Sequence, residues 1–118
     1  MRQPVPIALF IALLCLTIDC RAASGRVFVT NEKGDSVSVI DTKTNQVIKT
    51  IAIGKRPRGV GLAPDGSAVY VAVSGENHIA VIDPKTLELK GSFASGDDPE
   101  AFAVHHNVNI YISNENDA

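Results

Sequence analysis

The stretch Gly54–Val73, GKRPRGVGLAPDGSAVYVAV, decides the fold of this chain. It contains a Gly-x-x-Pro start, a run of small and apolar residues, a Pro-Asp-Gly turn and a second apolar run around a tyrosine. Proline and glycine at such positions mark turns, and short valine-rich runs between turns mark strands. The stretch therefore predicts two short strands joined by a tight turn.

The same plan recurs along the chain at a nearly constant spacing. Gly54 and Pro57 return 42 residues later as Gly96 and Pro99. Two triplets recur as well. Val27–Val29 returns as Val69–Val71 after 42 residues and as Ile110–Ile112 after a further 41. Val39–Asp41 returns as Val81–Asp83 after 42 residues. A repeat of this length with short strands is typical of a β-propeller blade of four antiparallel strands.

The sequence therefore predicts an all-β fold, with a partial β-propeller of about two blades over residues 23–118 and an incomplete ring. The innermost strand of the quoted stretch alternates Gly59, Gly61 and Ala63 with larger residues, which fits a place where strands converge. A two-sheet sandwich would explain the strands but not the recurrence. The predicted strands are Arg26–Thr30, Ser36–Asp41, Gln46–Ile53, Arg58–Ala63, Ala68–Val73, His78–Asp83, Leu87–Phe93, Pro99–Val104 and Asn107–Ser113.

The N-terminal residues have a different character. Arg2 precedes the 12-residue apolar run Ile7–Ile18, and Cys20-Arg21-Ala22 follows it. A run this short does not reach the roughly 20 residues that a membrane-spanning helix needs. We interpret residues 1–22 as a secretory signal peptide, with a buried N-terminal helix as the alternative. The protein is then periplasmic or secreted, and the mature chain has no stable membrane span and no cysteine.

Composition narrows the classes of partner. The 118 residues are 45% apolar and 20% charged, with a net charge of −2 and no tryptophan. Nucleic-acid phosphates are usually bound by clustered lysine and arginine, and this chain has no basic run. We expect no nucleic-acid partner.

Two charged segments precede the inner strands. In Lys55–Arg58 the charges are positive, and at the equivalent places in Asp97–Glu100 they are negative. In a propeller the two segments lie side by side near the central channel. We expect either ion pairs that fix blade packing, or a surface that binds an anionic ligand or charged partner. The residues that would bind a ligand or partner are Arg56, Arg58, Asp98 and Glu100.

No set of residues indicates catalysis. His105 and His106 are adjacent in a predicted turn, where a joint metal site is awkward. Ser74 and Ser95 also lie in turns, with no histidine at a suggestive spacing. We expect a protein without enzymatic activity, metal site or cofactor.

Several segments resemble a known family. Phe28–Asn31, Tyr70–Val73 and Tyr111–Asn114 resemble the signature of the YVTN family of β-propeller repeats. Within that family the chain looks most similar to the β-propeller proteins associated with PQQ-dependent catabolism. The segments that carry this finer resemblance are Val29–Lys33, Gly54–Gly59, Ser95–Glu100 and Tyr111–Glu115.

The resemblance implies an exported propeller of bacteria that oxidise alcohols or related compounds with quinoprotein dehydrogenases. The members of this group have no firmly assigned catalytic residues, so the resemblance assigns none to this chain. The expected function is a non-catalytic binding or scaffold protein, with protein partners in that periplasmic system. The alternatives are a channel-sited propeller enzyme, such as a quinoprotein-like oxidoreductase or a hydrolase, and a surface adhesion module. A closed ring needs about four blades or more, so we also expect an N-terminal fragment.

Overall fold

A computed structural model of the chain describes residues 2–3, 25–107 and 109–116. The described strands form three antiparallel sheets, with the orders β1-β2-β3, β4-β5-β6-β7 and β8-β9. The predicted signal peptide, residues 1–22, lies outside the described residues apart from 2 and 3. Within the described ranges, no helix is long and apolar enough to cross a membrane.

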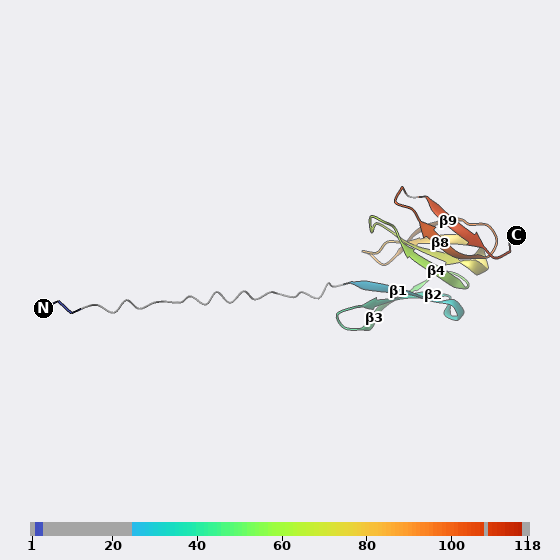
Figure 1. Ribbon diagram of the computed structural model, residues 1–118. Helices are drawn as coiled ribbons and strands as arrows, with labels where there is room; N and C mark the ends of the chain where they lie inside the picture. Colours follow the sequence, from blue (N-terminus) through green and yellow to red (C-terminus); the bar gives the residue numbers. More distant parts are fainter. Residues whose placement is uncertain (1, 4–24, 108, 117–118) are drawn as a thin grey trace.

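Each sheet corresponds to one blade or part of one, and the predicted all-β propeller fold is confirmed (Figure 1). The second sheet has all four strands, and β4 and β8 are the inner strands of neighbouring sheets. All nine predicted strands are present, with ends shifted by up to three residues. The first sheet contains β1 (Arg26–Asn31), β2 (Ser36–Asp41) and β3 (Gln46–Ala52). The second contains β4 (Pro57–Leu62), β5 (Val69–Val73), β6 (His78–Ile82) and β7 (Leu89–Ala94). The third contains β8 (Pro99–Val104) and β9 (Ile110–Asn114).

The turn between β1 and β2 contains a short 3₁₀ helix, η1 (Glu32–Gly34). The residue with positive φ is Asp35, at 51°, rather than the glycine beside it. The next repeat has η2 (Ser74–Glu76) and Asn77 with φ 56°. Aspartate and asparagine tolerate this left-handed conformation better than other non-glycine residues. Each also has a side-chain oxygen that glycine lacks, and this oxygen accepts a hydrogen bond from the turn before the next inner strand.

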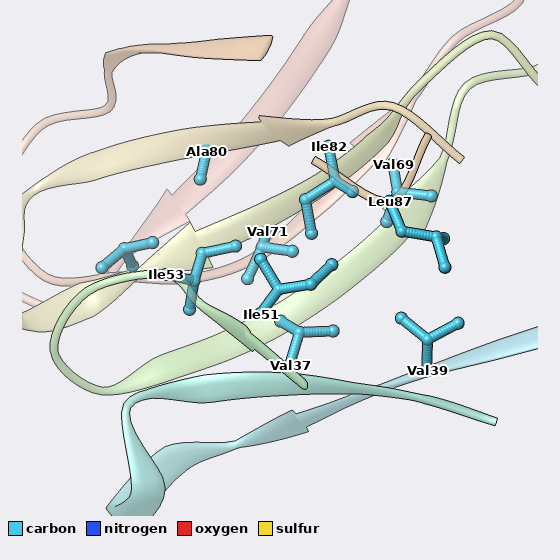
Figure 2. Close-up of a cluster of buried hydrophobic side chains, with 10 residues drawn as sticks. Val37, Val39, Ile51, Ile53, Val69, Val71, Ala80, Ile82 and Leu87 are labelled. Atoms are coloured by element: carbon cyan, nitrogen blue, oxygen red, sulfur yellow. The ribbon is translucent and has the colours of Figure 1, made fainter. Parts of the chain in front are cut away.

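A cluster of buried apolar side chains lies between the first and second sheets (Figure 2). Val37 and Val39 of β2 are fully buried, while Ser38 between them is only partly buried on the opposite face. Burying each such valine contributes about 1.5–3 kcal/mol relative to leaving it exposed. The cluster consists of Val37, Val39, Ile51, Ile53, Val69, Val71, Val73, Ala80, Ile82 and Leu87.

The second and third sheets meet through their inner strands. A Cβ atom on Gly59 would lie 2.8 Å from the backbone oxygen of Glu100, and one on Gly61 would lie 2.8 Å from Phe102 Cε2. The ring of Tyr70 packs edge-on against that of Phe102, with the centroids 6.4 Å apart. The expectation that small residues occupy a place of close strand approach is therefore confirmed for β4.

Candidate functional site

Charged side chains from all three sheets gather where the inner strands begin. The chain turns sharply before each inner strand, with positive φ at Gly54 and Arg56 before β4 and at Gly96 and Asp98 before β8. The backbone N–H of Arg56 donates to Asp35 Oδ1 at 3.1 Å, and that of Asp98 donates to Asn77 Oδ1 at 2.9 Å. We call the resulting group the charged surface: Glu32, Arg56, Arg58, Asp98, Glu100 and Glu115.

Arg58 is the centre of this surface. Its Nη2 lies 2.9 Å from Glu100 Oε1 on β8, and its Nη1 donates to Glu115 Oε2 at 2.8 Å. The hydrogen bond to Glu115 raises the pKa of the Arg58 guanidinium, and the charge of Glu100 adds to the effect. Arg58 thus joins the second sheet to the third, and the ion pair expected between positions 58 and 100 is present.

Arg56 and Asp98 do not pair with each other, so the position-by-position match expected for the two segments is wrong at this place. Arg56 Nε lies 3.6 Å from Glu32 Oε1, and both side chains are half exposed. Asp98 Oδ2 instead accepts a hydrogen bond from Asn116 Nδ2 at 3.1 Å. The physical reason is that nearby turns supply closer partners: Glu32 for Arg56, and Asn116 for Asp98. An exposed pair such as Arg56–Glu32 contributes only about 0–1 kcal/mol.

The charged surface combines half-exposed ions with more buried ones: Glu32, Arg56, Glu100 and Glu115 are about half exposed, whereas the Arg58 side chain is 22% exposed and Asp98 Oδ1 is buried. Its four carboxylates and two guanidinium groups give it a net charge of −2 by formal count. Because Arg58 already contacts two carboxylates, a free anion would have to displace them. No group of three or more His, Cys, Asp or Glu side chains in the described ranges could hold a metal ion. The arrangement is suited to contact with a charged surface rather than to capture of a small anion.

Sequence reasoning missed Glu32 and Glu115. Both directly follow the asparagine of the family signature, as Asn31-Glu32 and Asn114-Glu115. This shared position was the available signal, since it puts a carboxylate beside the start of an inner strand. The binding role predicted for Arg56, Arg58, Asp98 and Glu100 stays a prediction.

The two adjacent histidines lie in the turn after β8. Their ring centroids are 3.9 Å apart, and His105 Nδ1 lies 2.7 Å from Asn107 Oδ1. Both side chains are exposed. The two histidines contact each other and Asn107 within the turn, as expected for a turn that is exposed to solvent.

Sheets of up to four antiparallel strands, stacked face to face with their inner strands side by side, define a β-propeller. The chain belongs to the YNCE-like β-propeller family, which it matches over residues 5–117.

The chain is also similar to individual proteins. The chain is 27% identical over 93 residues to Antigen Lp49 of Leptospira interrogans, covering 67% of this chain and 20% of that protein. It is 41% identical over 46 residues to the uncharacterized protein YncE of Salmonella typhi, covering 39% of this chain and 13% of that protein. Among solved structures, hydrazine synthase of Kuenenia stuttgartiensis has a TM-score of 0.72 at 23% identity, covering 77% of this chain and 26% of that one. The chain thus spans a fifth or less of these two curated relatives.

Proposed function

We propose that this chain is part of an exported, non-catalytic β-propeller that binds a charged protein partner through the charged surface. The proposed partner is a component of a periplasmic PQQ-dependent (quinoprotein) oxidation system. One observation carries the proposal. The four segments that resemble the PQQ-associated propellers lie far apart in the sequence, yet each contributes a charged side chain to this one surface: Glu32, Arg56 and Arg58, Asp98 and Glu100, and Glu115.

The geometry supports a protein partner rather than a small ligand. The ion pairs are spread over three sheets, and the side chains of Glu32, Glu100 and Glu115 remain 50%, 48% and 52% exposed. Exposed charges arranged in this way steer and orient a partner more than they add affinity. Export is supported by the signal-peptide pattern of residues 1–22.

The test measures binding of this chain to a purified PQQ-dependent alcohol dehydrogenase from the same organism. Arg58→Glu should weaken binding by about tenfold or more, because it removes both ion pairs that hold Glu100 and Glu115 and so changes the arrangement of charges that the partner meets. The matched control is Lys43→Glu, the same charge change in the exposed turn between β2 and β3, and it should change binding by less than about twofold. Binding should also weaken as the salt concentration rises.

A second variant separates binding from folding. If Glu100→Arg added to Arg58→Glu restores both stability and binding, the pair only fixes blade packing and the proposed binding role is wrong. If stability returns while binding stays weak, the role is supported. Absence of binding by the unaltered chain would overturn the proposed partner.

A further inference from the structure

One side chain holds each turn that leads from a sheet to the inner strand of the next sheet. Before β4, Asp35 Oδ1 accepts a hydrogen bond from the backbone N–H of Arg56 at 3.1 Å. Before β8, Asn77 Oδ1 accepts one from the backbone N–H of Asp98 at 2.9 Å. The backbone oxygen of each holding residue also accepts an N–H from the residue that directly follows the outermost strand of its sheet, at 3.2 and 3.3 Å. Asp35 and Asn77 therefore do the same work in two consecutive repeats.

The two turns that they hold carry opposite charges. Lys55–Arg56 is basic, and Asp97–Asp98 at the equivalent places is acidic. The holding residue differs between the repeats in the complementary sense. The carboxylate of Asp35 holds the basic turn, whereas the neutral amide of Asn77 holds the acidic one.

The amide of Asn77 makes two contacts with the acidic turn, and a carboxylate could make only one of them. Its Oδ1 accepts from the backbone of Asp98, and its Nδ2 donates to Asp97 Oδ1 at 3.1 Å. An ionised aspartate has no side-chain donor. At position 77 it would still accept from the backbone, but it would place a second negative charge at hydrogen-bonding distance from Asp97, where like charges repel.

A second position in the same turns changes in the same way. Glu32 Oε1 lies 3.6 Å from Arg56 Nε, and the repeat counterpart of Glu32 is Ser74. Ser74 is 2% exposed, so a carboxylate at this place would lose its hydration. Glu76 of η2 is acidic, but its Oε1 accepts from the backbone N–H of Lys55 at the start of the same sheet. Positions 32 and 35, which contact the basic turn, are thus acidic, and their counterparts 74 and 77 are neutral.

We propose that Asp35 and Asn77 are positioning residues, each matched to the charge of the turn that it holds. The amide at position 77 allows Asp97 and Asp98 to lie in consecutive places beside the charged surface. An aspartate at that position would destabilise the acidic turn, whereas an asparagine at position 35 would be tolerated by the basic one. The match therefore specifies which turn packs on which sheet. This inference concerns packing within the chain and does not depend on the proposed partner.

The experiment exchanges the two holding residues in the full chain and measures urea denaturation. Asn77→Asp should lower the folding equilibrium constant by about tenfold or more, because it keeps the acceptor for Asp98 but removes the donor to Asp97 and adds a like charge. The matched control is Asp35→Asn, the reverse exchange at the equivalent place. It should change the constant by less than about threefold, because the amide oxygen still accepts from Arg56.

Salt separates repulsion from the simple loss of a hydrogen bond. Asn77→Ala removes both side-chain hydrogen bonds and adds no charge, so its effect on the folding constant should be the same at low and high salt. The effect of Asn77→Asp should shrink by at least about threefold between about 0.05 and about 1 M salt, because the Debye length falls to about 3 Å.

A double variant tests the match directly. Asn77→Asp combined with Asp97→Lys gives the second turn the same pair of residues that Asp35 and Lys55 form in the first. It should return the folding constant to within about threefold of that of the unaltered chain. Asp97→Lys alone completes the cycle, and the coupling between positions 77 and 97 should be about tenfold or more.

Three results would each overturn the proposal: equal losses from the two single exchanges, a loss from Asn77→Asp that salt leaves unchanged, or no recovery in the double variant. If Asn77→Asp does not fold, a double variant that folds supports the proposal. A double variant that also fails to fold overturns it.

Discussion

The interface between the first and second sheets differs from that between the second and third. In the former, the aliphatic side chains of β2 and β3 meet those of β5 and β6 and form the main core (Figure 2). In the latter, β4 and β8 approach so closely that Gly59 has no room for a Cβ atom, and Arg58 bridges the sheets to Glu100. The first interface thus depends on large aliphatic side chains, whereas the second depends on the absence of a side chain and on an ion pair.

The difference shows that the size of the side chains in a blade depends on how far they lie from the inner strands. Where β2 and β3 face β5 and β6, branched side chains fill the space between the sheets. Near the inner strands the backbones converge, so small residues are needed and the charges that flank them come within pairing distance. The same repeat therefore supplies valine or isoleucine at one place and glycine or alanine at another.

The largest expected effect comes from breaking the aliphatic interface. Ile82 is fully buried in it, and Ile82→Ala should lower the free energy of unfolding by about 2–5 kcal/mol through lost burial and a cavity. The control is Leu89→Ala in the same sheet, where the half-exposed side chain should cost less than about 0.5–1 kcal/mol. Urea denaturation measures both. Equal losses would mean that the cluster is not the main source of stability.

A smaller effect is expected at the interface of inner strands. Gly59→Ala should cost about 1–3 kcal/mol, because the new methyl group would clash with the backbone of β8. It should also separate Tyr70 from Phe102, which NMR contacts between the two rings would detect. Gly91→Ala is the control: its Cβ would meet no atom within 4 Å, so the change should stay within about 0.5 kcal/mol. A cost at Gly91 as large as at Gly59 would contradict close approach as the cause.

The smallest effect concerns acid sensitivity of the turn that Arg26 contacts. Backbone N–H groups of Lys85 and Thr86 donate to Asp83 and lower its pKa below the ordinary 3.8. A lowered folded-state pKa stabilises the folded chain fully above about 3.8, and this stabilisation is lost as the pH falls through the folded value.

Asp83→Asn should therefore reduce the loss of stability between neutral pH and pH values below about 3.8. The measurement is urea denaturation at several pH values, together with the carboxyl shift of Asp83 by NMR. An unchanged profile for Asp83→Asn would argue against a stabilising carboxylate in this turn.

Much of the fold was predictable from the sequence because a strand and its turn are local features. The short valine-rich runs between turns and the recurrence of Val69–Val71 at one repeat length correctly predicted strands and blades. The positive φ at Asp35 was not predicted; this residue ends η1, and its side chain accepts a hydrogen bond from Arg56, 21 residues away. From the local sequence, the glycine beside it was an equally good candidate for the positive φ.

The candidate site was predictable only in part for a similar reason. Opposite charges at equivalent places of two repeats indicated that Arg58 and Glu100 would meet. The same reasoning failed for Arg56, which pairs with Glu32 of the preceding turn. Charge patterns identify which residues could pair, whereas the distance between side chains depends on where the turns lie.

The sequence by itself determined that this protein is built from repeated four-stranded units, because each unit repeats the same spacing of apolar runs and turns. Only the tertiary structure decided that Glu32 and Glu115 join the charged surface. Their shared place after the signature asparagine is visible in the sequence, but the arginines that they contact belong to another sheet, and the distance to them depends on how the sheets pack.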